Sequence, residues 1–336
     1  MDLEHIWLMI CSFLVFSMQA GFLCLETGLT RSKNNINVAL KNILDFVICI
    51  FIFWLVGYGI SYGNSWHGLI GTSRFVAFSQ SYDFQEISFF ILQTLFCCTA
   101  VTIVSGAVAE RVRFNAYILI GFIIAFMFYP IFVHWGWSQQ GGQSGWLLSL
   151  GFFDCAGSTV IHSIGGWIAL ATILIIGPRK DAIDPVTRTR NIHGYNLPIA
   201  ILGTMILFIG WIGFNIGSTI LQKGSIAYTF INTLLSGIAG GLAVYLYSAL
   251  RYQGKLLAQD MIVGVMSGLV SITASCYIVG PIEAICIGGI GGLIGLLTDR
   301  ILLRVNYQPD LAFAKSEHPF RGVASSNGPC GFSCLF

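Results

Sequence analysis

The chain has 336 residues, of which 55% are hydrophobic and only 10% are charged, and its net charge is +2. Its mean hydropathy is +0.78, whereas a soluble domain usually has about 25% charged residues. The composition therefore excludes an ordinary soluble domain, predicts no nucleic-acid partner, and predicts an all-α protein that crosses a membrane many times.

Apolar runs of about 20 residues recur along the whole chain and predict nine membrane-spanning helices. The runs cover residues 5–28, 38–61, 87–109, 114–137, 156–177, 194–215, 227–248, 260–278 and 281–303. The first run is expected to stay in the mature protein, because acidic Asp2 and Glu4 precede it where a signal peptide has basic residues. Residues 1–305 are therefore expected to form one membrane domain.

Basic residues separate strongly between the two sides of the predicted bundle. The loops after the odd-numbered helices, or the borders of those loops, carry Arg31, Lys33, Lys41, Arg111, Arg113, Arg179, Lys180, Arg188, Arg190, Arg251, Lys255, Arg300 and Arg304. The opposite side has only Arg74 and Lys223. Because cytoplasmic loops are enriched in Lys and Arg, this pattern predicts a multi-pass protein of the cell membrane with its N-terminus outside.

The fifth run places two ionisable side chains in an apolar setting. Asp154 precedes "CAGST" and suits the start of a helix, where its carboxylate accepts hydrogen bonds from free backbone N–H groups. His162 follows eight residues later, about 12 Å deeper along a helix. An ionisable residue at that depth usually faces a cavity or a polar group, so His162 either lines a pathway or bonds to a neighbouring helix.

Aromatic residues approach the same outer depth from several helices. Phe96 lies in the third run, Trp137 ends the fourth, and Trp211 and Phe214 lie in the sixth, followed by Ser218. A cation that has lost its water is stabilised over aromatic faces. These rings and one hydroxyl above a histidine therefore suit a small cation that later becomes neutral.

The first and sixth helices also share a weak internal similarity. "AGFLCLETG" and "IGFNIGS" both contain Gly-Phe, and a polar residue, Glu26 or Ser218, follows the glycine by five positions. Units of five helices would place the second copy upside down relative to the first, which is a common transporter design.

Four stretches in order resemble one known family. "MQAGFLCLETGLTRSKNNINVALKNILD" (18–45), "AVAERVRF" (107–114), "FFDCAGSTVIH" (152–162) and "IGWIGFNIGS" (209–218) are similar to motifs of the ammonium transporter family, Amt/MEP, the relatives of the Rhesus proteins. The first stretch looks closest to bacterial members, including members fused to signalling domains. The resemblance implies an inverted-repeat helical bundle that assembles as a homotrimer with one pore in each subunit.

The resemblance also implies roles for individual residues at the outer mouth. Trp137, Ser218 and Phe96 would form the site that recruits ammonium, and Phe96 and Phe214 would be the stacked rings that close the pore below it. Asp154 would support the recruiting site structurally.

Below the rings, the resemblance implies that Trp211 lines the pore and that His162 is the first of two pore histidines. Ammonium would give up a proton and cross as ammonia, since carrying an intact cation through a dry pore is very costly. A neutral histidine can both donate and accept hydrogen bonds there. The resemblance implies no cofactor and no metal.

The similarity ends after "RILLRV" (300–305), so the sequence shows nine of the family's eleven helices. Residues 306–336 form an atypical stretch that is expected to be disordered. Its His318 is not assigned as the second pore histidine, and its Cys330 and Cys334 are expected to bind no metal. A PII-type regulator is not expected, because the segment that contacts it is not recognised.

Three readings of function remain open at this point: an ammonium transporter, an ammonium-sensing receptor without transport, and an inactive truncated transporter. An intramembrane enzyme that uses His162 and Asp154 is not favoured, since neither a nucleophile nor a metal cluster accompanies them.

Overall fold

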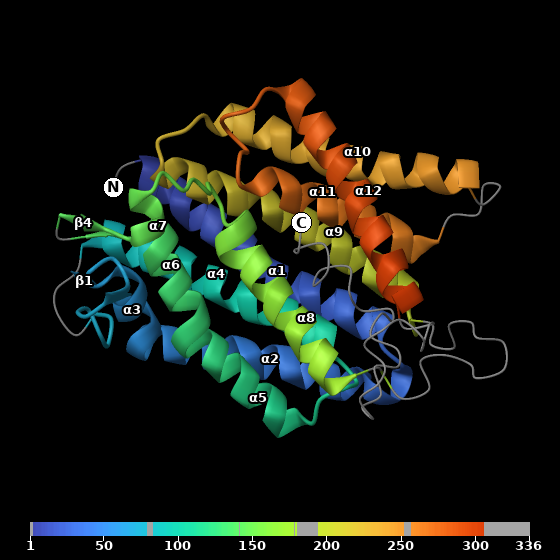
Figure 1. Ribbon diagram of the computed structural model, residues 1–336, viewed down its shortest axis with the longest axis horizontal. Coiled ribbons are helices and arrows are strands. Elements are labelled where there is room, and N and C mark those ends of the chain that lie inside the picture. The colour runs from blue at the N-terminus through green and yellow to red at the C-terminus, as the bar shows by residue number, and fades with distance from the viewer. Residues whose placement is uncertain are drawn as a thin grey trace.

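The computed structural model describes residues 3–78, 83–140, 142–177, 179, 194–251 and 257–305, and within these ranges the chain forms a bundle of long helices (Figure 1). Eight helical segments of the described chain are long and apolar enough to cross a membrane. They are α1 (Leu3–Leu29), the segment Ser32–Tyr62, α4 (Phe84–Val108), the segment Phe114–Trp137, the segment Ser158–Ile176, α9 (Leu197–Leu221), α10 (Ile226–Arg251) and α12 (Pro281–Val305).

These eight segments confirm eight of the nine predicted spans, and the remaining one is shorter than predicted. The apolar run 260–278 predicts a full span, but α11 covers only Ala258–Thr273. After Thr273 the chain forms turns, in which Ser275 N–H donates to Ile272 O and Ile278 N–H donates to Ser275 O. Apolar composition alone therefore extended this prediction past the real end of the helix.

Three of the spans contain a short π-helical stretch. Residues Phe53–Gly57 join α2 (Asn35–Ile52) to α3 (Tyr58–Tyr62), and residues Ile124–Phe128 join α5 (Phe114–Ile123) to α6 (Tyr129–Trp137). Residues Ser158–Ser163 precede α8 (Ile164–Ile176). Such stretches are rare and often mark functional sites; the third of them contains His162.

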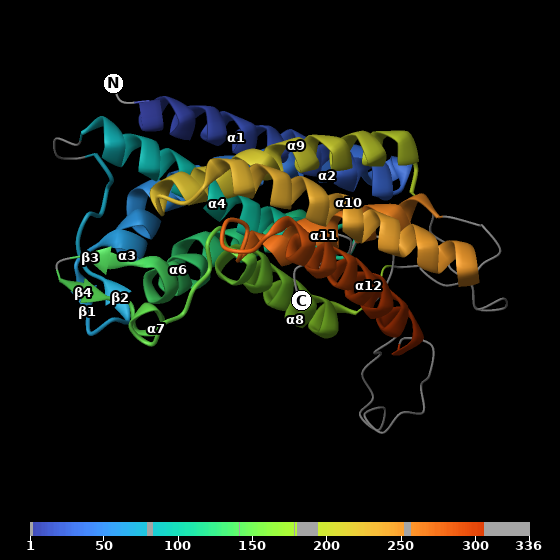
Figure 2. The ribbon, with the colours of Figure 1, turned by 90° about the horizontal axis from the view of Figure 1, so that it is seen from above.

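The first half of the chain (α1 to α8) packs against the second half (α9 to α12) mainly through α1 and α9, which lie side by side in both views (Figure 2). A Cβ atom added to Gly203 of α9 would lie 2.5 Å from Leu25 N and 2.6 Å from Gly21 O of α1. Only glycine permits so close an approach of two helix backbones. The two helices that share the Gly-Phe motif are thus direct neighbours.

Two small hairpins cover the end of the bundle at which the described chain begins (Figure 1). They are β1 (Ser65–Trp66) with β2 (Ile70–Gly71), and β3 (Gln139–Gln140) with β4 (Gln143–Ser144), followed by the one-turn helix α7 (Trp146–Ser149). The first hairpin is held to α6, because the rings of His134 and Trp135 bond to Ser65 Oγ at 2.9 Å and to Leu69 O at 2.8 Å. Both hairpins and α7 fall between the predicted membrane-spanning runs, where the sequence predicted no helix.

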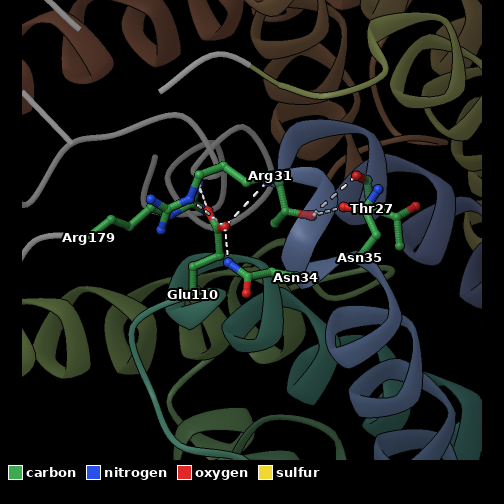
Figure 3. Close-up of polar contacts among 7 residues, drawn as sticks. Thr27, Arg31, Asn34, Asn35, Glu110 and Arg179 are labelled. Atoms are coloured by element: carbon green, nitrogen blue, oxygen red, sulfur yellow. Dashed lines mark hydrogen bonds and ion pairs between the residues drawn. The ribbon is translucent and has the colours of Figure 1, made fainter. Parts of the chain in front are cut away.

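A charged cluster ties the helices together at the opposite end of the bundle (Figure 3). Glu110, which follows α4, pairs with Arg31 at 2.9 Å and with Arg179 at 2.9 Å, and Asn34 donates to the same carboxylate. Burial raises the pKa of Glu110, but Arg179, Asn34 and Arg31 together outweigh this effect and hold the pKa below its ordinary value. The cluster joins segments that are about 70 to 150 residues apart in sequence.

Candidate functional site

Aromatic rings from three helices are in contact between the two halves of the bundle. The ring centroids of Phe96 (α4) and Phe214 (α9) are 4.3 Å apart, and those of Phe96 and Trp137 (α6) are 6.4 Å apart. Phe96 and Phe214 are both fully buried. The two phenyl rings therefore touch each other across the junction of the two halves.

His162 lies next to this aromatic cluster. Its ring stacks on the indole of Trp211 with centroids 4.7 Å apart and an angle of 11° between the planes, and it lies 5.4 Å from the ring of Phe214. Both His162 and Trp211 are buried. The structure therefore brings five of the predicted residues into one column that runs from Trp137 through Phe96 and Phe214 to the stacked pair.

Trp211 is held in place by a residue that the sequence did not single out. Its indole N–H donates to Thr273 Oγ1 at 2.8 Å, and that hydroxyl donates to Leu269 O at 2.7 Å. Thr273 is the last residue of α11 and is buried. The one signal for it in the sequence is a polar residue in the apolar run 260–278, which did not distinguish it from its neighbours.

Asp154 organises the π-helical turn that contains His162. Its carboxylate accepts four backbone N–H groups, from Gly157 and Ser158 at Oδ1 and from Thr159 and Val160 at Oδ2, at 2.8–3.0 Å. The sequence predicted that Asp154 would accept such bonds, but it did not predict their number.

The geometry of the turn follows from its first residues. Gly157 has φ = +97°, which a residue with a Cβ rarely adopts, and its carbonyl accepts the N–H of His162 at 3.0 Å, five residues along the chain. This wider hydrogen-bond spacing sets the position of the imidazole.

The same short segment also anchors the outermost ring. The indole N–H of Trp137 donates to the carbonyl of Asp154 at 2.7 Å. The main chain of Asp154 therefore positions Trp137, while its side chain positions the turn that carries His162. One residue links the outer aromatic ring to the histidine deeper in the bundle.

Ser218 lies one helical turn beyond Phe214 on α9 and is buried, with 3% of its surface exposed. Its hydroxyl donates to the carbonyl of Phe214 at 3.2 Å. Since that bond occupies the hydroxyl hydrogen, the oxygen keeps lone pairs with which to accept a hydrogen bond from another group.

Among the described residues, no group of three or more His, Cys, Asp or Glu side chains is placed to hold a metal ion. His318, Cys330 and Cys334 lie outside the described residues. The column contains four aromatic side chains and one imidazole, and the face of an aromatic ring attracts cations.

Comparison with known proteins gives a consistent result. The model of the Ammonium Transporter Family matches residues 6–310. The chain is similar to ammonium transporter Amt2 of Archaeoglobus fulgidus, with 39% identity over 305 residues that cover 88% of this chain and 64% of the relative. A Synechocystis sp. relative is 43% identical over 316 residues, which cover 90% of this chain and 57% of the relative. The chain thus spans less than two thirds of the length of these two proteins.

Solved structures show the same similarity. A protein described as a sensor Amt protein superposes with a TM-score of 0.86 and 36% identity, covering 99% of this chain and 81% of its own. Candida albicans Mep2 superposes with a TM-score of 0.79 and 26% identity, covering 98% of this chain and 71% of its own.

Proposed function

Since the chain belongs to the ammonium transporter family, we propose that it moves ammonium or ammonia across the cell membrane through the column of rings that ends at His162. The observation that carries this proposal is the unbroken contact from Trp137 to the stacked pair of His162 and Trp211. The related proteins named as ammonium transporters support the choice of substrate.

The outer end of the column recruits the cation in this proposal. Ammonium lies against the faces of Trp137 and Phe96, where the negative quadrupole of each ring attracts it. Ser218 Oγ accepts one N–H of the ion, since its own hydrogen is used in the bond to Phe214. An ion without N–H groups cannot donate a hydrogen bond to this oxygen and interacts with it through charge alone.

The closed ring pair makes deprotonation necessary. A cation between Phe96 and Phe214 would lose its hydration where no polar group replaces it, at a cost of several kcal/mol. Ammonia has no net charge and crosses at much lower cost. Potassium has no proton to release and is therefore excluded.

The imidazole of His162 then provides hydrogen bonds below the ring pair. A neutral imidazole has one donor and one acceptor nitrogen, so it can bind ammonia and relay a proton. Asp154 and Trp211 act as positioning residues, because they hold the turn of His162 and the face of its ring.

The proposed orientation places the hairpin end of the bundle outside the cell and the Glu110 cluster at the cytoplasmic face. Most Lys and Arg residues of the described chain lie in or beside the loops at the Glu110 end, and cytoplasmic loops carry an excess of these residues. A homotrimer is proposed from family membership, and residues 1–305 are proposed as its membrane domain.

Uptake of labelled methylammonium by cells without their own ammonium transporters tests the proposal. We expect uptake with the parent chain, background uptake with His162→Ala, and normal uptake with Trp167→Leu, whose side chain is 60% exposed on the same helix. A His162→Ala protein that is folded and transports normally would rule out the column as the pathway.

A second candidate function is sensing, because one of the similar solved structures is described as a sensor Amt protein. A sensor binds ammonium at the outer site without moving it. Saturable binding to the purified protein together with background uptake would support sensing, whereas uptake into protein-containing liposomes would support transport.

A further inference from the structure

Two free cysteines meet where the two halves of the bundle join at the outer end. Cys155 precedes the π-helical turn of the first half, Cys276 follows α11 of the second half, and their Sγ atoms are 3.5 Å apart. The backbones are also paired, since Cys155 N–H donates to Ala274 O at 3.0 Å and Ala156 N–H donates to Thr273 O at 3.2 Å. The two thiols are therefore held together by main-chain contacts on both sides.

The side chains around the two sulfurs are polar and complete the junction. Thr219 Oγ1 lies 3.8 Å from Cys155 Sγ and 3.7 Å from Cys276 Sγ. Gln222 Nε2 donates to Cys155 O at 2.8 Å, and Tyr277 Oη donates to Gln222 Oε1 at 3.0 Å at the exposed rim. The thiols are thus buried but lie only a layer below the outer surface.

We propose that Cys155 and Cys276 form a reversible disulfide that crosslinks the two halves and slows transport. One thiolate attacks the O–O bond of a peroxide, which yields a sulfenic acid and hydroxide. The sulfur of the second cysteine then attacks the sulfenic acid and forms the S–S bond. The OH group of the sulfenic acid leaves as water. Two thiols lose two electrons and two protons in total, the peroxide is reduced to water, and a dithiol reductant reverses the change.

The chemical environment favours one of the two thiols as the attacking group. Hydrogen bonding with Cys155 lowers the pKa of Cys276 despite its burial, and the same contact raises the pKa of Cys155. The thiolate is the nucleophile in this chemistry, and the contact between the two sulfurs helps one thiol of the pair to ionise.

The effect on transport rests on the proposed function and follows from the neighbours of the pair. A disulfide needs an S–S distance of about 2.05 Å, so the sulfurs must approach each other by roughly 1.5 Å. Cys155 follows Asp154, whose carbonyl holds Trp137, and Cys276 lies three residues beyond Thr273, which holds Trp211. Closing the bond therefore pulls on the supports of both indoles.

Crosslink formation is tested on the full chain in membranes. Treatment with hydrogen peroxide or diamide, followed by proteolysis and mass spectrometry, should reveal a peptide pair that contains Cys155 and Cys276 and has lost two hydrogen atoms. The pair should disappear after treatment with dithiothreitol and in Cys155→Ser and Cys276→Ser. The matched control Cys286→Ser removes an exposed thiol of α12 and should leave the crosslink intact.

Methylammonium uptake before and after oxidation tests the consequence. Oxidation should slow uptake of the parent and of Cys286→Ser on the order of threefold or more. The sulfurs move by roughly 1.5 Å when the bond forms, and a displacement of about 1 Å is enough to disturb a precisely positioned site. Dithiothreitol should restore the rate, and Cys155→Ser should transport equally before and after oxidation.

The outcomes separate this inference from the proposed function. No Cys155–Cys276 peptide after oxidation, in a chain that transports normally, overturns the disulfide. A complete crosslink with unchanged uptake overturns its effect on transport. A crosslink in a chain that never transports leaves the disulfide supported and contradicts the proposed function alone.

Discussion

Replacing Asp154 by Asn is the sharpest test of how the turn that carries His162 is held. The carboxylate accepts Gly157 and Ser158 N–H at Oδ1 and Thr159 and Val160 N–H at Oδ2. An amide keeps one acceptor oxygen and turns an NH₂ group toward the other two donors. Whichever way the amide is oriented, two backbone N–H groups inside the protein lose their acceptor.

The expected cost follows from the number and kind of these bonds. A hydrogen bond to a charged group contributes about 1.5–3 kcal/mol, so the loss of two bonds lowers the free energy of unfolding by about 3–6 kcal/mol. Asp154 is only 3% exposed, so solvent does not replace the missing acceptors. Thermal unfolding of the purified protein, followed by tryptophan fluorescence, measures the change, and methylammonium uptake should fall with it.

Asp83→Asn is the matched control because the chemical change is the same. Asp83 lies at the exposed start of α4, and its side chain accepts a single N–H, from Glu86 at 2.8 Å. Asn caps a helix about as well as Asp, so this variant should unfold within about 0.5 kcal/mol of the parent. Equal unfolding midpoints for the two variants would refute the reasoning, since four acceptor contacts would then contribute no more than one.

Three further predictions test other parts of the site and of the Glu110 cluster. Thr273→Val leaves the Trp211 indole N–H without its acceptor, so thermal unfolding should show a loss of about 1–3 kcal/mol; an unchanged midpoint contradicts this. Phe214→Ala should reduce methylammonium uptake more than Phe96→Ala, because Phe214 also touches the histidine below; the reverse order counts against the column. The pKa of Glu110 is lowered, so its stabilising effect is present above the ordinary value of 4.5 and is lost as the pH falls through the folded value. Glu110→Gln should therefore unfold with a weaker dependence on acid pH, and an equally steep dependence would show that other groups cause the loss.

The spans could be predicted from the sequence because hydrophobic length and charge placement are properties of short segments. In the membrane, the backbone N–H and C=O groups of each apolar run have to form hydrogen bonds within the run, because lipid offers none. A helix satisfies this requirement. The exception, α11, shows the limit of this logic. Its apolar run continues past Thr273, but the backbone there turns, and Ala274 O accepts the N–H of Cys155 in the first half, a contact that hydropathy does not encode.

The residues of the column could be named from the sequence, but their arrangement could not be derived from it. Trp211, Phe214 and Ser218 recur at spacings of three and four, which places them on one face of α9. Their partners, Phe96 and His162, come from helices of the other half, and ring contacts of this kind depend on how the halves pack. The π-helical turn before α8 was likewise missed, because it results from four hydrogen bonds to one carboxylate.

The column of rings lies where the two halves of the bundle meet, so residues from both halves form it and hold it in place. α9 supplies two residues of the column, while α4, α6 and the turn before α8 supply the other three rings. A small shift of one half would separate Phe96 from Phe214, whose centroids are 4.3 Å apart. The glycine contact between α1 and α9 resists such a shift in the membrane interior, and the Cys155–Cys276 junction resists it at the outer end. The positioning of the rings is thus a property of the interface between the halves, and under the proposed function we expect changes at that interface to alter transport without touching the substrate.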